Sequence, residues 1–200
     1  MFLHINTTMN AVERMSDRRV ILLQSKACLL MINVVSQDEC LVTKRSPEPL
    51  RQTANILDKL GFLQPGLVTS KNIQDIAGET QTDLIYGYFD TVNKIDDRTY
   101  VANGWAILPE RNEVADGVIL TYENAEGEDI ILKLINQRMS RPSVREYFDN
   151  STYLDSGWQK SFTVKEIPQG RVKLKAWAFD TETGKAFLLN QTQVVCPEIE

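Results

Sequence analysis

The sequence predicts a mainly β protein, an antiparallel sandwich of the immunoglobulin-like or fibronectin-like kind with a small helical segment at its N-terminus. Three observations predict this class. The hydrophobic period changes from 3.6 to about 2 near residue 84, turn-forming residues then recur roughly every 8 to 15 positions, and no helical pattern interrupts the run. We therefore expect a helical segment with a connector at 1–83 and a sandwich domain at 84–196. A closed barrel is the alternative for the same pattern.

Seven short strands are expected in the C-terminal part of the chain. They fall near residues 84–89, 99–108, 117–123, 129–136, 157–164, 171–179 and 186–195. The breaks between them carry turn residues, as in Pro109-Glu110-Arg111-Asn112 and Pro168-Gln169-Gly170. Alternation within a strand assigns side chains to opposite faces. In 99–108, for example, the small residues Ala102, Gly104 and Ala106 oppose Trp105 and its neighbours.

Two helices are expected before the sandwich. The first begins at Thr8 or Asn10 and runs to about Ser25. The second is marked at both ends, because Ser46 precedes Pro47 as an N-cap and Gly61 follows as the C′ residue. An apolar stripe lies between these signals, formed by Leu50, Ala54, Leu57 and Leu60, and Phe62 falls where a contact with the last turn is usual. Residues 63–82 are expected to form a polar connector.

Composition and charge limit the classes of partner. Of 200 residues, 42% are hydrophobic and 24% are charged, which is typical of a folded soluble protein. The net charge of −5 disfavours nucleic acid and anionic lipid as partners. The most apolar stretch, 20–35, is interrupted by Gln24, Ser25 and Lys26, and residues 1–12 lack the features of a signal peptide. We therefore expect a soluble chain without a membrane-spanning segment or a signal peptide.

The sequence offers little catalytic chemistry. The one histidine, His4, lies near the N-terminus, and neither a nucleophile elbow, a P-loop nor a dinucleotide fingerprint is present. The acidic clusters do not follow the spacing of a calcium loop. We expect no catalytic residue, metal or cofactor. The alternative is a carboxylate-dependent glycan hydrolase, whose candidate residues are Asp96, Asp116 and Asp129.

One strand face is a candidate ligand or partner surface. Alternation in 171–179 places Lys173, Lys175, Trp177 and Phe179 together, opposite the apolar set that includes Leu174. A tryptophan and a phenylalanine beside two lysines need a cover or a partner. This face is either covered by the N-terminal helices or binds a ligand, and a bulge that resets the register is a third reading.

The cysteines leave two readings open. Cys28 and Cys40 flank an apolar run and could close a loop in an exported protein, whereas Cys196 has no obvious partner. Three reduced thiols are the other reading.

Several motifs occur in an order that resembles a known module. They are Gly87-Tyr88-Phe89-Asp90, Gly104-Trp105-Ala106, Arg141-Pro142-Ser143-Val144, Ser156-Gly157-Trp158 and Ala176-Trp177-Ala178-Phe179-Asp180. This set resembles the C-terminal immunoglobulin-like sandwich of bacterial, especially cyanobacterial, glycosyltransferase-type polytopic membrane proteins. Cys28-Leu29, Cys40, Leu60-Gly61-Phe62 and Pro65 resemble the juxtamembrane region before that module. Ser143 stands where the family usually has Asp, so a ligand role for that acid does not carry over.

The resemblance implies a place and a role. In such parent proteins the region faces the extracytoplasmic side of the membrane, which favours a Cys28–Cys40 disulfide. The chain is then a non-catalytic accessory or binding module of the cell envelope, with a polypeptide or a glycan as its partner. A glycan hydrolase and a purely structural spacer are the alternatives.

Overall fold

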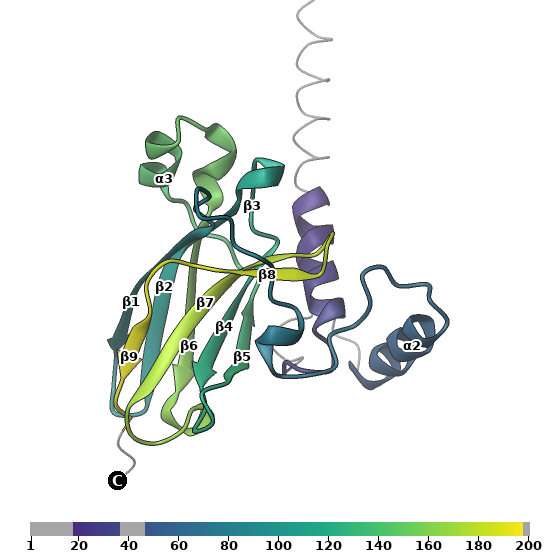
Figure 1. Cartoon of the computed structure of the whole chain (residues 1–200), viewed down its shortest axis with the longest axis horizontal. Coiled ribbons are helices and arrows are strands. Elements are labelled where there is room, and N and C mark those ends of the chain that lie inside the picture. Colours follow the sequence, from purple (N-terminus) through teal and green to yellow (C-terminus); the bar gives the residue numbers. More distant parts are fainter. Residues whose placement is uncertain (1–17, 37–46, 198–200) are drawn as a thin grey trace, which may run out of the picture.

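The computed structural model describes residues 18–36 and 47–197, and within them the chain forms two antiparallel sheets packed face to face (Figure 1). The first sheet contains β1 (Gly87–Lys94), β2 (Thr99–Leu108), β3 (Glu113–Val114) and β6 (Gly157–Thr163). The second contains β4 (Gly117–Glu123), β5 (Asp129–Ile135), β7 (Val172–Asp180), β8 (Lys185–Leu188) and β9 (Gln193–Val195). The predicted sandwich is therefore confirmed, and the barrel is not formed.

The strand predictions hold best where alternation is regular. The expected strands at 99–108 and 117–123 match β2 and β4 from end to end. The first strand lies later than expected, at Gly87–Lys94. The last expected strand is divided into β8 and β9, because Gln191 adopts a left-handed backbone with φ of 72° and breaks the extended run between them.

The main core lies between the sheets. Its largest fully buried side chains include Phe89, Leu120, Phe162 and Leu174. The small residues of β2 face this core, because Ala102 and Ala106 are buried in the same cluster as Trp158 and Phe162. Trp105 therefore points to the outer face of the first sheet, where a smaller cluster of buried residues surrounds it.

The outer face of the second sheet is covered by the N-terminal segment. Residues 18–30 are helical and lie beside the sandwich (Figure 1). Ala27 and Met31 belong to one buried cluster with Trp177 and Phe179. The connector runs from β5, where Asn72 pairs with Ile130, to β8 at the other end of the same sheet, where Ala77 pairs with Ala186. Its short 3₁₀ turn, η2 (Ile73–Asp75), buries Ile73 completely, so the connector is part of the packed structure.

The helix α2 (Pro47–Lys59) confirms the prediction from its flanking residues. Gly61 has φ of +74°, and its N–H donates to Asp58 O while the N–H of Phe62 donates to Leu57 O. These two bonds form a Schellman motif. Ser46, the expected N-cap, lies outside the described residues, as does most of the first expected helix.

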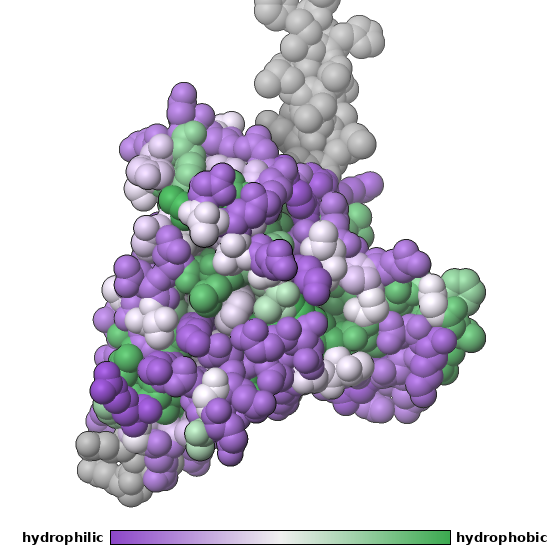
Figure 2. Space-filling model, in the orientation of Figure 1, coloured by the Kyte–Doolittle hydropathy of each residue, from purple (hydrophilic) through white to green (hydrophobic). Residues whose placement is uncertain are grey.

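The apolar stripe of α2 is less buried than its pattern indicates. Ala54 is buried, but Leu60 and Phe62 are 64% and 72% exposed. Phe62 therefore does not bury its ring against the last turn of the helix. Figure 2 shows apolar surface at the end of the α2 region that lies farthest from the sandwich. No helix among the described residues is long and apolar enough to cross a membrane.

The outer face of the first sheet carries a helical cap that the sequence pattern did not predict. It consists of α3 (Pro142–Tyr147) and the 3₁₀ helix η4 (Ser151–Asp155), which pack against each other and against β3. Val144 and Tyr153 cover Trp105 and Ile107. This cap forms one wall of the candidate site.

Candidate ligand-binding groove

Four of the sequence motifs meet at one place on the first sheet. Tyr88 of β1 lies opposite Trp105 of β2 in the strand register, and their ring centroids are 5.5 Å apart. The Arg-Pro motif leads into α3, with Pro142 at its first turn. The Ser-Gly-Trp motif opens β6, where Gly157 pairs with Trp105. Segments far apart in the sequence are thus brought to a single site.

Glycines allow these segments to approach closely. A Cβ on Gly104 would lie 2.2 Å from the carbonyl oxygen of Tyr88 and 2.7 Å from the Trp158 ring. A Cβ on Gly157 would lie 2.6 Å from Cγ of Arg141. Neither position has room for a side chain, so close packing of the neighbouring segments requires glycine in both motifs.

An ion pair joins the first strand to the start of α3. Arg141 Nη2 lies 2.7 Å from Asp90 Oδ2, and both side chains are about one-third exposed. Asp90 is the residue at which the β1–β2 register shifts between Phe89 and Thr91. A bulge at this position changes the direction of a side chain relative to a regular strand. The Arg141 guanidinium is thereby held at the rim of the groove.

The groove itself is aromatic. It has a volume of about 320 Å³ and is lined by Ile85, Tyr88, Trp105, Arg141, Ser143, Val144, Tyr147 and Phe148. Phe148 contacts both Trp105 and Tyr147 edge to face, at centroid distances of 5.8 and 4.9 Å. Tyr147 is 75% exposed, which is unusual for so large a ring. The groove combines ring surfaces with the donors of Arg141, Ser143 and the tyrosines.

The strand face for which both cover and ligand binding were left open lies elsewhere in the fold. Trp177 is 5% exposed and Phe179 is fully buried beneath the helix at 18–30. The indole N–H of Trp177 donates to Thr121 Oγ1 at 3.0 Å, so its polar group is satisfied internally. Of the readings left open for this face, the burial of these two residues fits cover by the N-terminal segment.

The two lysines of that face have acidic neighbours. Lys173 Nζ lies 2.8 Å from Glu123 Oε1, and Lys175 Nζ lies 2.8 Å from Asp129 Oδ2. Lys173 is exposed and Lys175 is half-buried. They form ion pairs across the β4–β7 ladder and its neighbour β5, which is a structural role.

The three candidate hydrolase carboxylates are not brought together. Asp96 lies in the turn between β1 and β2 and accepts from the N–H of Arg98, while Asp129 begins β5. Asp116 precedes β4, so the length of a seven-residue strand, about 20–25 Å, separates it from the β4–β5 turn. Among the described residues no group of three or more metal-binding side chains is present.

Asp116 instead belongs to a charged cluster around Arg111. The Arg111 guanidinium contacts Asp116 Oδ2 at 3.0 Å and Glu113 Oε2 at 2.6 Å, and it also pairs with Asp180. Burial opposes the charge of Arg111, but Asp116 and the other carboxylates outweigh it and raise the pKa of Arg111. Burial likewise opposes ionisation of Glu113, yet hydrogen bonds from Arg19 and Arg111 lower the pKa of Glu113. Arg19 thereby ties the N-terminal helix to the end of the sandwich.

Two of the three cysteines, Cys28 and Cys196, lie among the described residues. Cys28 is disulfide-bonded, and Cys196 is an exposed free thiol. Cys40, the expected partner of Cys28, lies outside the described residues, so the pairing stays a prediction.

The chain matches no model of a protein family, and it matches no curated protein. The groove therefore has to be interpreted from its own residues. The motifs around Trp105 and Arg141 were visible in the sequence, but the exposed ring of Tyr147 was missed, because α3 is too short to show a helical period.

Proposed function

We propose that this chain is a non-catalytic binding module whose aromatic groove binds a glycan. The observation that carries the proposal is the groove between β1, β2 and α3, where an exposed tyrosine ring lies beside an anchored arginine. Its volume of about 320 Å³ is at the lower end of the range of about 300–1,000 Å³ for small-molecule sites. This size suits a short saccharide.

The chemistry of the groove favours a glycan over a polypeptide. Pyranose rings present C–H groups on their flat faces and hydroxyls at their edges. The ring of Tyr147 can stack against such a face, while Arg141 and Ser143 can donate to hydroxyls or ring oxygens. The charge of Arg141 is already matched by Asp90, which suits a neutral ligand better than a charged peptide.

The resemblance supplies the setting of the proposal. Four of the motifs that resemble the module of glycosyltransferase-type membrane proteins meet at this groove, which supports reading the groove as the binding site of such a module. On this proposal the module belongs to the cell envelope and presents its groove to a glycan on the extracytoplasmic side.

A glycan array tests the proposal directly. Wild-type chain should bind one class of oligosaccharide, and Tyr147→Ala should lose that binding by at least ten-fold. The matched control is Phe62→Ala, because Phe62 is a similarly exposed aromatic residue on a different surface. Equal binding by Tyr147→Ala and wild type would exclude this groove, and binding of peptides in place of glycans would support a polypeptide-binding module instead.

The hydrolase alternative predicts a different result. Wild type would then release reducing sugar from the bound glycan, and alanine at Asp96, Asp116 or Asp129 would abolish that release. A binding module should show no turnover in any of these variants. The spacer alternative predicts no binding at all on the array.

A further inference from the structure

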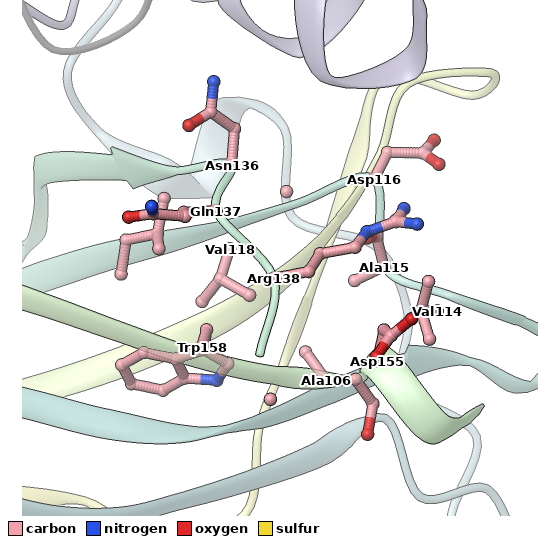
Figure 3. Close-up of a pocket in the computed structure, with 14 residues that line it drawn as sticks. Ala106, Val114, Ala115, Asp116, Val118, Asn136, Gln137, Arg138, Asp155 and Trp158 are labelled. Atoms are coloured by element: carbon pink, nitrogen blue, oxygen red, sulfur yellow. The ribbon is translucent and has the colours of Figure 1, made fainter. Parts of the chain in front are cut away.

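A small cavity lies between the two sheets, near the end that carries β3 and η4. Its lining comes from the β3–β4 turn, the segment that follows β5, and the start of β6 (Figure 3). The cavity measures about 10 Å³, which is the space that the centre of one water molecule needs. It is separate from the aromatic groove, with which it shares no lining residue.

The lining of this cavity contains several buried polar atoms that have no hydrogen-bond partner. Five buried side-chain atoms of the described residues have no hydrogen-bond partner, and four of them belong to residues that line it. They are Asp116 Oδ1, Arg138 Nε, Ser156 Oγ and Trp158 Nε1. Asp116, Ser156 and Trp158 are each less than 5% exposed. Burying a polar atom without a partner is unfavourable, so four such atoms on residues that line one cavity require an explanation.

Asp116 and Arg138 each have another side-chain atom that is hydrogen-bonded. Asp116 Oδ2 accepts from the backbone and hydroxyl of Thr181 at 2.9 and 2.8 Å and from Arg111 at 3.0 Å. Arg138 Nη2 donates to the carbonyl of Ala115 at 3.1 Å. The unmet groups are thus two donors, one acceptor and one hydroxyl that can act as either.

Water is the ligand that matches this set. It both donates and accepts, it fits a space of this size, and a buried water typically makes about three hydrogen bonds. We propose that the cavity is an internal hydration site. An ordered water there accepts a hydrogen bond from the indole N–H of Trp158 and forms a second with the Ser156 hydroxyl, next to the polar side chains of Asp116 and Arg138. The site binds β6 of one sheet to the β3–β4 turn that enters the other.

The cavity adjoins a larger hollow. This hollow of about 320 Å³ between the helix at 18–30 and η4 shares four lining residues with the cavity, namely Val114, Asp116, Arg138 and Asp155. A neutral molecule of water size is the expected occupant of the cavity, because the charge of Asp116 is already compensated by Arg111.

Water-to-protein NMR on the full ¹⁵N-labelled chain tests the site. The Hε1 proton of Trp158 should show cross-peaks to water of opposite sign in NOE and ROE spectra, which marks a bound water rather than proton exchange. Trp177 is the internal control, because its indole donates directly to Thr121 and should show no such pair of peaks. Trp158→Phe assigns the resonance, and triple-resonance spectra assign it if that variant does not fold. Absence of the Trp158 peaks, or equal peaks at Trp177, would overturn the proposal.

Discussion

Arg141 and Asp90 are 51 residues apart in the sequence, yet Nη2 of the arginine lies 2.7 Å from Oδ2 of the aspartate. The pair joins the helical cap of the first sheet to the bulge in its edge strand. It fixes one wall of the aromatic groove relative to the other. The geometry of the groove therefore depends on a contact that no local pattern specifies.

The Arg141–Asp90 pair should be measurable as a coupling energy. A double-mutant cycle with Asp90→Asn and Arg141→Gln should give about 0.5–1 kcal/mol in denaturant unfolding, because both groups are partly exposed and screened. The coupling should fall at 1 M salt. An additive result would mean that the two side chains do not act together in solution.

Gly104 should tolerate no side chain. Gly104→Ala places a methyl group against the backbone of Tyr88 and the Trp158 ring, so we expect a loss of at least about 2 kcal/mol of unfolding free energy. Gly127→Ala is the control, because Gly127 has open space around it and only its φ of +80° opposes alanine, at about 1 kcal/mol. Similar losses in both variants, measured in urea, would contradict the close packing at the motif.

Trp177 should behave as a core residue. Trp177→Ala should lower the unfolding free energy by about 3–5 kcal/mol, because it leaves a cavity beneath the N-terminal helix and removes the bond to Thr121. Val194→Ala, at an exposed position in β9, should change it by less than about 0.5 kcal/mol. A stable Trp177→Ala protein with reduced glycan binding would instead indicate that the strand face with Trp177 binds the ligand.

Acid should weaken the charged cluster. The pKa of Glu113 is lower in the folded chain than its ordinary value of 4.5, so its ionised form stabilises the fold above that value. This contribution is lost as the pH falls below about 4.5 and through the folded-state pKa. Glu113→Gln should therefore flatten the fall in Tm between pH 5 and pH 3, whereas Glu126→Gln in the β4–β5 turn should not. Parallel curves for wild type and Glu113→Gln would contradict the assignment.

Much of the sandwich could be predicted because its signals are local. The β2 and β4 strands alternate regularly, and α2 is bounded by Pro47 and Gly61, so each could be placed from neighbouring residues alone. Alternation also grouped Trp177 with Phe179. It could not say that Ala102 and Ala106 face the core, because that depends on large side chains of other strands, such as Trp158 and Phe162, filling the same core.

The site could be predicted only in part. The motifs marked Trp105 and Arg141, but the groove needs the bulge at Asp90 and the six-residue helix α3, and neither leaves a periodic signal. The cavity beside Trp158 depends on how three separate segments meet, which a single sequence does not show.

The central claim is that the aromatic groove binds a glycan. The most direct measurement is a ¹⁵N and aromatic ¹³C NMR titration of the full chain with the oligosaccharide found on the array. Saturable shifts should concentrate on Tyr88, Tyr147, Phe148 and the Arg141 side chain. Shifts confined to the surface around Phe62 or Lys173, or no saturable shift at all, would contradict the account.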